Sequence, residues 1–167
     1  MIKKILLALV VALPLSTMAQ KFGVVDIESV FQAMPEYKAM QTQLEETSKK
    51  YEDEFAKLQE EVNRLYADYQ TLEKDANTPQ TIKERRQQEI QDKYTKVQQF
   101  RETAQQDLAR QEQQLAAPLQ QKLMDAINAV GAEGSYSFIL PKEGLLLYKG
   151  NDVVDVTDAV RTKLGIK

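Results

Sequence analysis

The chain has 167 residues, of which 28% are charged, and its formal net charge of −3 accompanies a pI near 5.2. A general nucleic-acid-binding protein would be basic, so this class is disfavoured. The chain contains neither cysteine nor histidine, so it has no disulfide framework and lacks the usual zinc ligands and the usual general base. We therefore expect no enzyme, no metal and no cofactor.

Residues 1–19 have the pattern of a secretory signal peptide. A basic start with Lys3 and Lys4 precedes an apolar run from Ile5 to Leu15, which is too short to span a bilayer. Thr17 and Ala19 supply small residues at the −3 and −1 positions of a cleavage site. We predict cleavage after Ala19, the alternative being an uncleaved anchor. The mature chain would carry 20 basic and 25 acidic residues.

Residues 37–130 have the pattern of two long helices. Apolar residues recur at alternating steps of three and four, as in a helix that buries a narrow stripe against a partner helix. Asn77 suits a left-handed residue after a helix, Thr78 an N-cap and Pro79 a first helical position. We therefore predict an antiparallel helical hairpin, with a kink in the second helix near Pro118. The predicted stripes are Tyr37, Met40, Leu44, Thr47, Tyr51, Phe55, Leu58, Val62, Leu65, Tyr69 and Leu72, and Ile90, Tyr94, Val97, Arg101, Ala104, Leu108, Gln111, Leu115 and Leu119.

The flanking segments, 20–36 and 131–167, have the pattern of a small α+β body. Strands are predicted at 21–25, at 136–140 and 145–148, which would form a β-hairpin, and at 153–154. Helices are predicted at 27–34 and after Asp155, which forms a capping-box pattern with Asp158. The fold class is thus α+β, with a long coiled-coil hairpin inserted in a β-rich body. Since about 50 residues make a marginal core, the body is expected to oligomerise, in a number that the residue pattern leaves open.

Nothing in the chain resembles a catalytic constellation. Carboxylates are scattered along solvated helix faces, and no glycine-rich phosphate loop or serine nucleophile elbow is present. Tyr66 and Phe100, however, are large apolar residues placed beside the predicted stripes. Such dispersed contacts, among many glutamines, suit loose binding of many unfolded chains better than tight binding of one ligand.

A basic cluster, Lys83, Arg85 and Arg86, follows the predicted turn. It either forms a solvated helix face paired with Glu84 and Glu89 or meets anionic partners and lipid headgroups. The 37–130 segment as a whole has about 14 basic and 17 acidic residues, so no large positive field is expected to steer acidic chains.

The order of short motifs resembles a known family. Phe22–Asp26 and Phe31–Tyr37 lead into a charged helical hairpin, and Tyr136–Leu140 and Asp152–Asp158 close the chain. This arrangement is similar to the Skp/OmpH family of periplasmic chaperones, over essentially the whole mature chain.

The resemblance implies a homotrimer in which strands form a shared body, and three arms surround a cavity for unfolded outer-membrane proteins, without ATP or catalysis. Better-known members are strongly basic, so capture of acidic clients or lipopolysaccharide carries over poorly, apart from the basic cluster. The alternative function is a structural coiled-coil adaptor that bridges components of the cell envelope.

Overall fold

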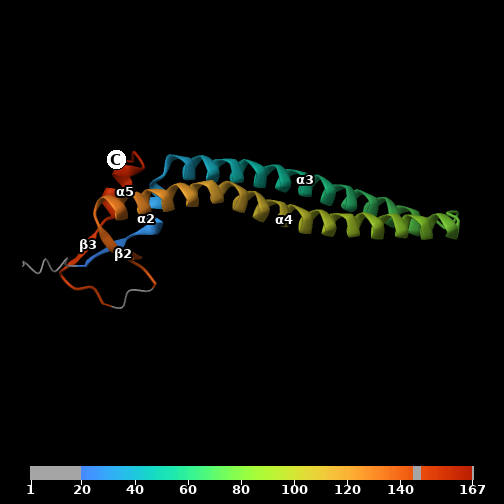
Figure 1. The fold of residues 1–167 in the computed structure, drawn as a ribbon. Helices are drawn as coiled ribbons and strands as arrows, with labels where there is room; N and C mark the ends of the chain where they lie inside the picture. Colours follow the sequence, from blue (N-terminus) through green and yellow to red (C-terminus); the bar gives the residue numbers. More distant parts are fainter. Residues whose placement is uncertain (1–19, 145–147, 167) are drawn as a thin grey trace, which may run out of the picture. The chain divides into compact units, whose positions relative to one another are not determined.

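The computed structural model describes residues 20–144 and 148–166, so the predicted signal peptide and residues 145–147 of a predicted strand lie outside the described part. Its described residues fall into two compact units, a hairpin unit of residues 28–125 and a sheet unit of residues 20–27 and 126–165. The elements in chain order, all but β1 labelled in Figure 1, are β1 (Lys21–Val25), α2 (Ile27–Ala33), α3 (Pro35–Lys74), α4 (Gln80–Glu133), β2 (Tyr136–Pro141), β3 (Val153–Asp155) and α5 (Thr157–Lys163).

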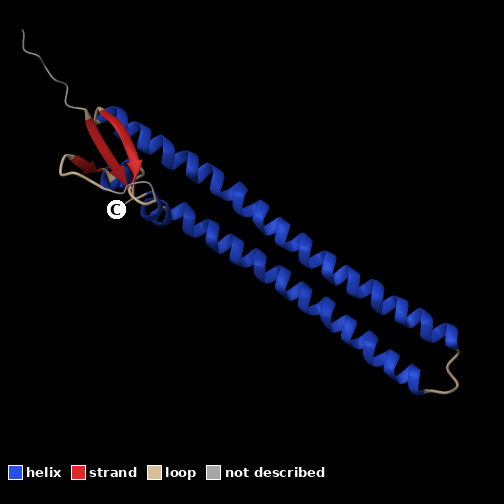
Figure 2. Cartoon of the chain, turned by 90° about the horizontal axis from the view of Figure 1, so that it is seen from below, coloured by secondary structure: helices blue, strands red, loops and turns tan. Residues whose placement is uncertain are grey.

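The hairpin unit is built from α3 and the larger part of α4, which run antiparallel and side by side (Figures 1 and 2). Pro35 occupies the first turn of α3, where its missing N–H costs nothing. All eleven predicted stripe residues of the first helix are buried or half-buried. The predicted helical hairpin is therefore confirmed, and α4 continues through Pro118.

The stripe of the second helix differs from the prediction. Tyr94 is 52% exposed and Arg101 is also exposed, whereas their neighbours Lys93 and Phe100 are half-buried. The step after Ile90 and after Val97 is thus three residues, not four. The placement of Tyr94 and Arg101 on the stripe was wrong. Because α4 has few apolar residues, its sequence pattern does not distinguish a step of three residues from a step of four.

The turn between α3 and α4 is organised by Asp75 and not by a left-handed residue. Asp75 has φ −81° and ψ 113°, and its carboxylate accepts the backbone N–H of Asn77 at 2.9 Å and the hydroxyl of Thr78 at 3.1 Å. Over residues 20–144 and 148–166, positive φ outside glycine occurs only at Ser135. The predicted left-handed Asn77 was therefore wrong, because an Asx turn reverses the chain without it.

The sheet has the order β2-β1-β3, and β1 pairs in parallel with both neighbours. β2 pairs with β1, and the predicted β-hairpin of 136–140 with 145–148 lies largely outside the described residues, in which Tyr148 belongs to no strand. Parallel pairing requires a long crossover between strands, which the α2–α3–α4 segment supplies. The predicted third strand is confirmed as β3.

The sheet unit holds a dry aliphatic core. Val24 and Val160 are 0% exposed, and Val25 and Val156 are 1% and 2% exposed. The N–H of Val156 donates to the carbonyl oxygen of Val24 at 2.8 Å. This hydrogen bond joins the residue between β3 and α5 to β1. Full burial of such a side chain stabilises a fold by about 1.5–3 kcal/mol. In the same unit, the α4 residues Ala126, Ile127 and Val130 are also buried.

Candidate functional site

The basic cluster after the turn is largely engaged within the hairpin. The Lys83 ammonium donates to the backbone oxygens of Glu73, at 3.0 Å, and Asp75, at 3.3 Å, and so caps the C-terminal end of α3. Arg86 pairs with Glu89 at 2.6 Å. Within the described residues neither Lys83 nor Arg85 forms an ion pair, and Arg85 is exposed. The cluster thus resembles the paired helix face more than an open anion site.

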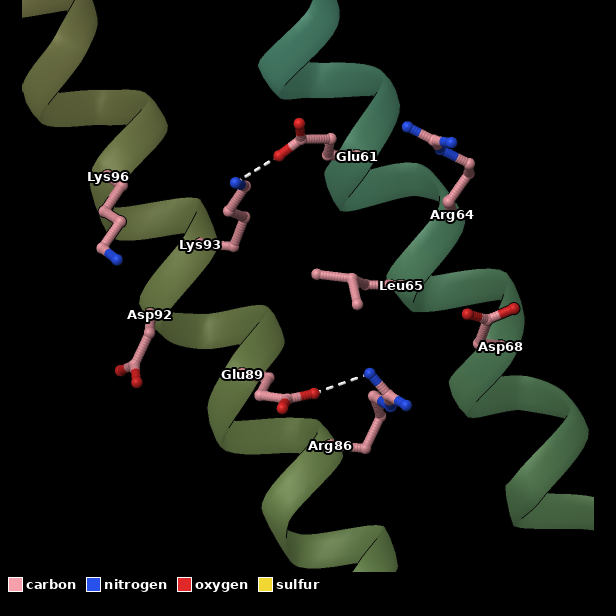
Figure 3. A pocket seen from close by; sticks show the side chains of 9 residues that line it. All are labelled: Glu61, Arg64, Leu65, Asp68, Arg86, Glu89, Asp92, Lys93 and Lys96. Atoms are coloured by element: carbon pink, nitrogen blue, oxygen red, sulfur yellow. Dashed lines mark hydrogen bonds and ion pairs between the residues drawn. The ribbon is translucent and has the colours of Figure 1, made fainter.

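A depression toward the turn, here named the tip depression, has a volume of about 610 Å³ and is shown in Figure 3. The ammonium of Lys93 on α4 contacts the carboxylate of Glu61 on α3, and this hydrogen bond lowers the pKa of Glu61. The lining contains as many basic as acidic residues, so the depression has no single-sign field. It is lined by Glu61, Arg64, Leu65, Asp68, Arg86, Glu89, Asp92, Lys93 and Lys96.

The two aromatic candidates lie in different surroundings. Tyr66 is 54% exposed, as expected for a residue beside the stripe. Phe100 is half-buried on the stripe, and its ring packs edge-on against Tyr51 with centroids 6.0 Å apart. Phe100 also lines a depression with Phe55 and Leu108. The structure therefore does not join Tyr66 and Phe100 in one pocket.

A polar contact that the residue pattern did not reveal crosses the hairpin at Tyr51. Its hydroxyl donates to the Asp107 carboxylate at 2.5 Å, and Gln111 donates to the same carboxylate at 2.6 Å. The hydrogen bond from Tyr51 is the main cause that lowers the pKa of Asp107, and it raises the pKa of Tyr51. Asp107 lies three residues after Ala104, the same step that brings Lys93 and Phe100 to the stripe. This part of the hairpin is consequently joined by polar as well as apolar contacts.

Three adjoining depressions follow α3 and α4 at the end of the hairpin away from the turn, and we call them together the basal groove. The first, about 640 Å³, shares Leu44, Glu45 and Glu112 with the second. The second, about 510 Å³, shares Ser48, Gln105 and Leu108 with the third, about 250 Å³. Shared lining residues make the groove continuous. Its apolar floor includes Phe31, Tyr37, Met40, Leu44, Phe55 and Phe100.

The sheet unit exposes large apolar side chains on its strands. Phe138 is 63% exposed and Leu140 is 45% exposed on β2, and Val154 on β3 is 40% exposed. The Phe138 ring stacks on Phe22 of β1, with centroids 6.2 Å apart. In the part of the chain described, β2 and β3 each leave one edge without a strand partner. Open edges beside exposed apolar residues are typical of a surface that another chain covers.

Asp155 joins the sheet to α5. Its carboxylate accepts both the hydroxyl of Thr157, at 2.6 Å, and the backbone N–H of Thr157, at 3.0 Å, and pairs with Lys142 at 3.3 Å. These contacts lower the pKa of Asp155 to about 2, and the hydrogen bond from the Thr157 hydroxyl contributes most to the shift. Asp158 bonds to Arg161, so an Asx turn at Asp155 starts the helix in place of the predicted capping box.

Residues 20–144 and 148–166 contain neither a metal-binding cluster nor a membrane-spanning helix. No group of three or more aspartate or glutamate side chains is arranged to hold a metal ion there. No helix in this part is both long and apolar enough to cross a membrane.

Most of the chain matches a known protein family. The model of the family described as outer membrane protein (OmpH-like) matches residues 21–164. The chain belongs to the OmpH-like family. The resemblance inferred from the motif order is thereby confirmed.

Comparison with solved structures supports the same fold. A protein from Caulobacter crescentus CB15 described as an OmpH-like outer membrane chaperone matches with a TM-score of 0.74 at 18% identity, over 87% of this chain and 83% of that one. Among curated proteins, none matches the sequence.

Proposed function

We propose that this OmpH-like chain is an ATP-independent periplasmic holdase chaperone. It binds unfolded outer-membrane proteins between helical arms and prevents their aggregation before membrane insertion. The observation that carries this proposal is an open apolar groove along a two-helix arm in a member of the OmpH-like family. A groove with half-buried aromatic residues and a polar rim offers many weak contacts, which suit clients that share no fixed shape.

The proposed holdase is a homotrimer joined through its body, residues 20–36 and 131–167, with residues 37–130 as the arm. Exposed Phe138 and Leu140 and the open edges of β2 and β3 support this division. Replacing Phe138 and Leu140 by aspartate should yield monomers, because two charges would be buried at the interface. Light scattering of the mature chain measures the mass, and a wild-type monomer at micromolar concentration would contradict the proposed assembly.

The proposed compartment is the periplasm, reached after cleavage near Ala19. Contact of the arm tips with lipopolysaccharide or with a membrane is expected to be weak. Lys83 and Arg86 already have partners inside the hairpin, and the tip depression has balanced charge. A single arginine gains little at an anionic surface at physiological salt.

Suppression of aggregation tests the function directly. A urea-unfolded outer-membrane β-barrel is diluted into buffer without nucleotide, with and without the mature chain, and light scattering is followed. The mature chain should suppress the scattering at roughly stoichiometric concentration. Unchanged scattering, together with binding to one folded envelope protein, would instead support the adaptor function.

The aromatic and basic candidates can be separated in the same assay. Replacing Tyr66 and Phe100 together by serine should weaken suppression more than replacing the basic cluster of Lys83, Arg85 and Arg86 by glutamine. Circular dichroism of both variants shows whether the hairpin remains helical, since Phe100 also packs on Tyr51. A silent aromatic pair and a damaging charge substitution would place client capture at the tips.

A further inference from the structure

The basal groove has the dimensions of a site for a short polypeptide segment. Its lining extends along α3 from Tyr37 to Phe55, and at about 1.5 Å per residue this stretch of helix is about 27 Å long. An extended chain advances about 3.3 Å per residue, so the groove accommodates about eight residues. All of its lining lies within the hairpin unit.

The rim of this groove is acidic. Glu28, Glu45, Glu52 and Glu112 line it and are exposed, and Arg101 at the Phe100 end is its basic lining residue. Across the described residues, none of these four carboxylates forms an ion pair with a lysine or an arginine. They thus present negative charge that no ion pair neutralises, beside an apolar floor.

The tip depression on the same hairpin shows that this asymmetry is local. It has four acidic and four basic lining residues. Within each of the ion pairs Lys93–Glu61 and Arg86–Glu89, the two charges neutralise each other. The balanced tip therefore has little preference for the sign of a ligand's charge, whereas the basal groove favours cations over anions.

We propose that the basal groove captures unfolded polypeptide segments in which lysine or arginine lies next to large apolar residues. The inference rests on the proposed holdase function and names the client chemistry. Apolar side chains pack on the floor, and the cationic ones pair with the rim carboxylates and lie against the half-buried aromatic rings. The amide side chains of Gln41, Gln105 and Gln120, which also line the groove, offer partners for the backbone of an extended segment.

The chemistry of the groove argues against other occupants. An anionic lipid headgroup or an acidic peptide would meet four carboxylates and one arginine, so the rim repels it. A purely apolar segment would pack on the floor but leave the rim unpaired. The floor thus supplies most of the affinity, and the rim decides which segments are preferred.

Labelled peptides test the preference. Three fluorophore-labelled eight-residue peptides alternate leucine with lysine, glutamine or glutamate, and fluorescence anisotropy measures their binding to the mature chain at about 0.05 M salt. Several exposed ion pairs acting together should make the lysine peptide bind about tenfold more tightly than the glutamate peptide. Raising the salt to about 0.5 M should reduce this ratio several-fold, because it shortens the Debye length.

Matched variants locate the effect. Replacing Glu45 and Glu112 by glutamine should remove most of the preference for lysine over glutamate. The control replaces Glu60 and Glu102, two exposed glutamates that do not line the groove, and should leave the preference unchanged although it alters the net charge equally. Since the chain has no cysteine, an environment-sensitive dye on Ser48→Cys reports occupancy of the groove, and one on Glu60→Cys is its control.

The outcomes separate this inference from the holdase proposal. Equal binding of the lysine and glutamate peptides, or equal effects of the two variant pairs, would overturn the cationic preference even if light scattering shows full suppression of aggregation. A dye response at Glu60→Cys but not at Ser48→Cys would overturn the location. Preferential binding of the lysine peptide without any suppression of aggregation would uphold the groove specificity and overturn the holdase function.

Discussion

The sheet unit and the hairpin unit of this chain bury their side chains in different ways. Val24, Val156 and Val160 of the sheet unit are almost completely inaccessible, whereas most stripe residues of the hairpin are only half-buried. The hairpin also depends on polar contacts between its helices, such as Tyr51 to Asp107 and Lys93 to Glu61. The stripe between α3 and α4 is thus less well buried than the core of the sheet unit, and this part of the hairpin is expected to open locally at lower free energy.

This difference matches the proposed division of roles. A dry aliphatic core resists local opening and suits an element that holds an assembly together. A two-helix arm with a narrow stripe and exchangeable polar contacts adjusts at modest cost, which suits loose contact with unfolded clients.

The largest effect is expected from a charge placed in the sheet core. Val24→Asp should unfold the sheet unit, since an unpaired buried carboxylate costs about 4 kcal/mol or more. Leu58→Asp in the hairpin should cost much less, because its half-exposed position lets the carboxylate reach water. Urea unfolding followed by circular dichroism measures both, and equal losses of stability would contradict the contrast between the units.

A smaller effect is expected when the polar contact in the hairpin is made apolar. Tyr51→Phe combined with Asp107→Leu removes both partners at once, which is often neutral or stabilising. Amide exchange around residues 47–58 and 100–111 should therefore stay unchanged or slow by up to about fivefold, because an apolar contact replaces the hydrogen bond. Exchange in β1 serves as the control, and slowing there as well would show that the two units do not open independently.

Acid should weaken the sheet unit through Asp155. Its folded pKa of about 2 lies below the ordinary pKa of 3.8, so its stabilising contribution is complete above the unfolded pKa and is lost as the pH falls toward 2. Asp155→Asn should flatten the dependence of stability on pH between about 4 and 2. Urea unfolding at several pH values checks this, and an unchanged slope in the variant would assign the acid sensitivity to other carboxylates.

The smallest effect is expected at the turn. Lys83→Met removes the ammonium that caps the C-terminal carbonyls of α3, so amides near residues 73–78 should exchange faster while the rest of the hairpin is unaffected. Arg85→Met removes the same charge from an exposed position and is the matched control. Equal exchange in the two variants would show that the capping contact contributes nothing in solution.

Local chemistry in the sequence determined several elements before any tertiary contact was known. Pro35 at a helix start, the break at residues 75–79 and the first helix stripe all follow from short-range geometry and a regular apolar period. The family also followed from the order of short motifs, since that order is itself local information. Even at the turn, the break was predictable although its residue was not, because Asp75 and Asn77 both suit chain reversal.

Only the tertiary structure decided the features that join distant residues. Val25 and Tyr136 are separated by the whole hairpin, so nothing local predicts that β1 and β2 pair in parallel. Lys93 and Phe100 reach the stripe because Glu61 and Tyr51 on the other helix receive them, a choice that the polar pattern of α4 leaves open. The basal groove arises in the same way, since α2, α3 and α4 each contribute lining that becomes a continuous surface only when the helices pack.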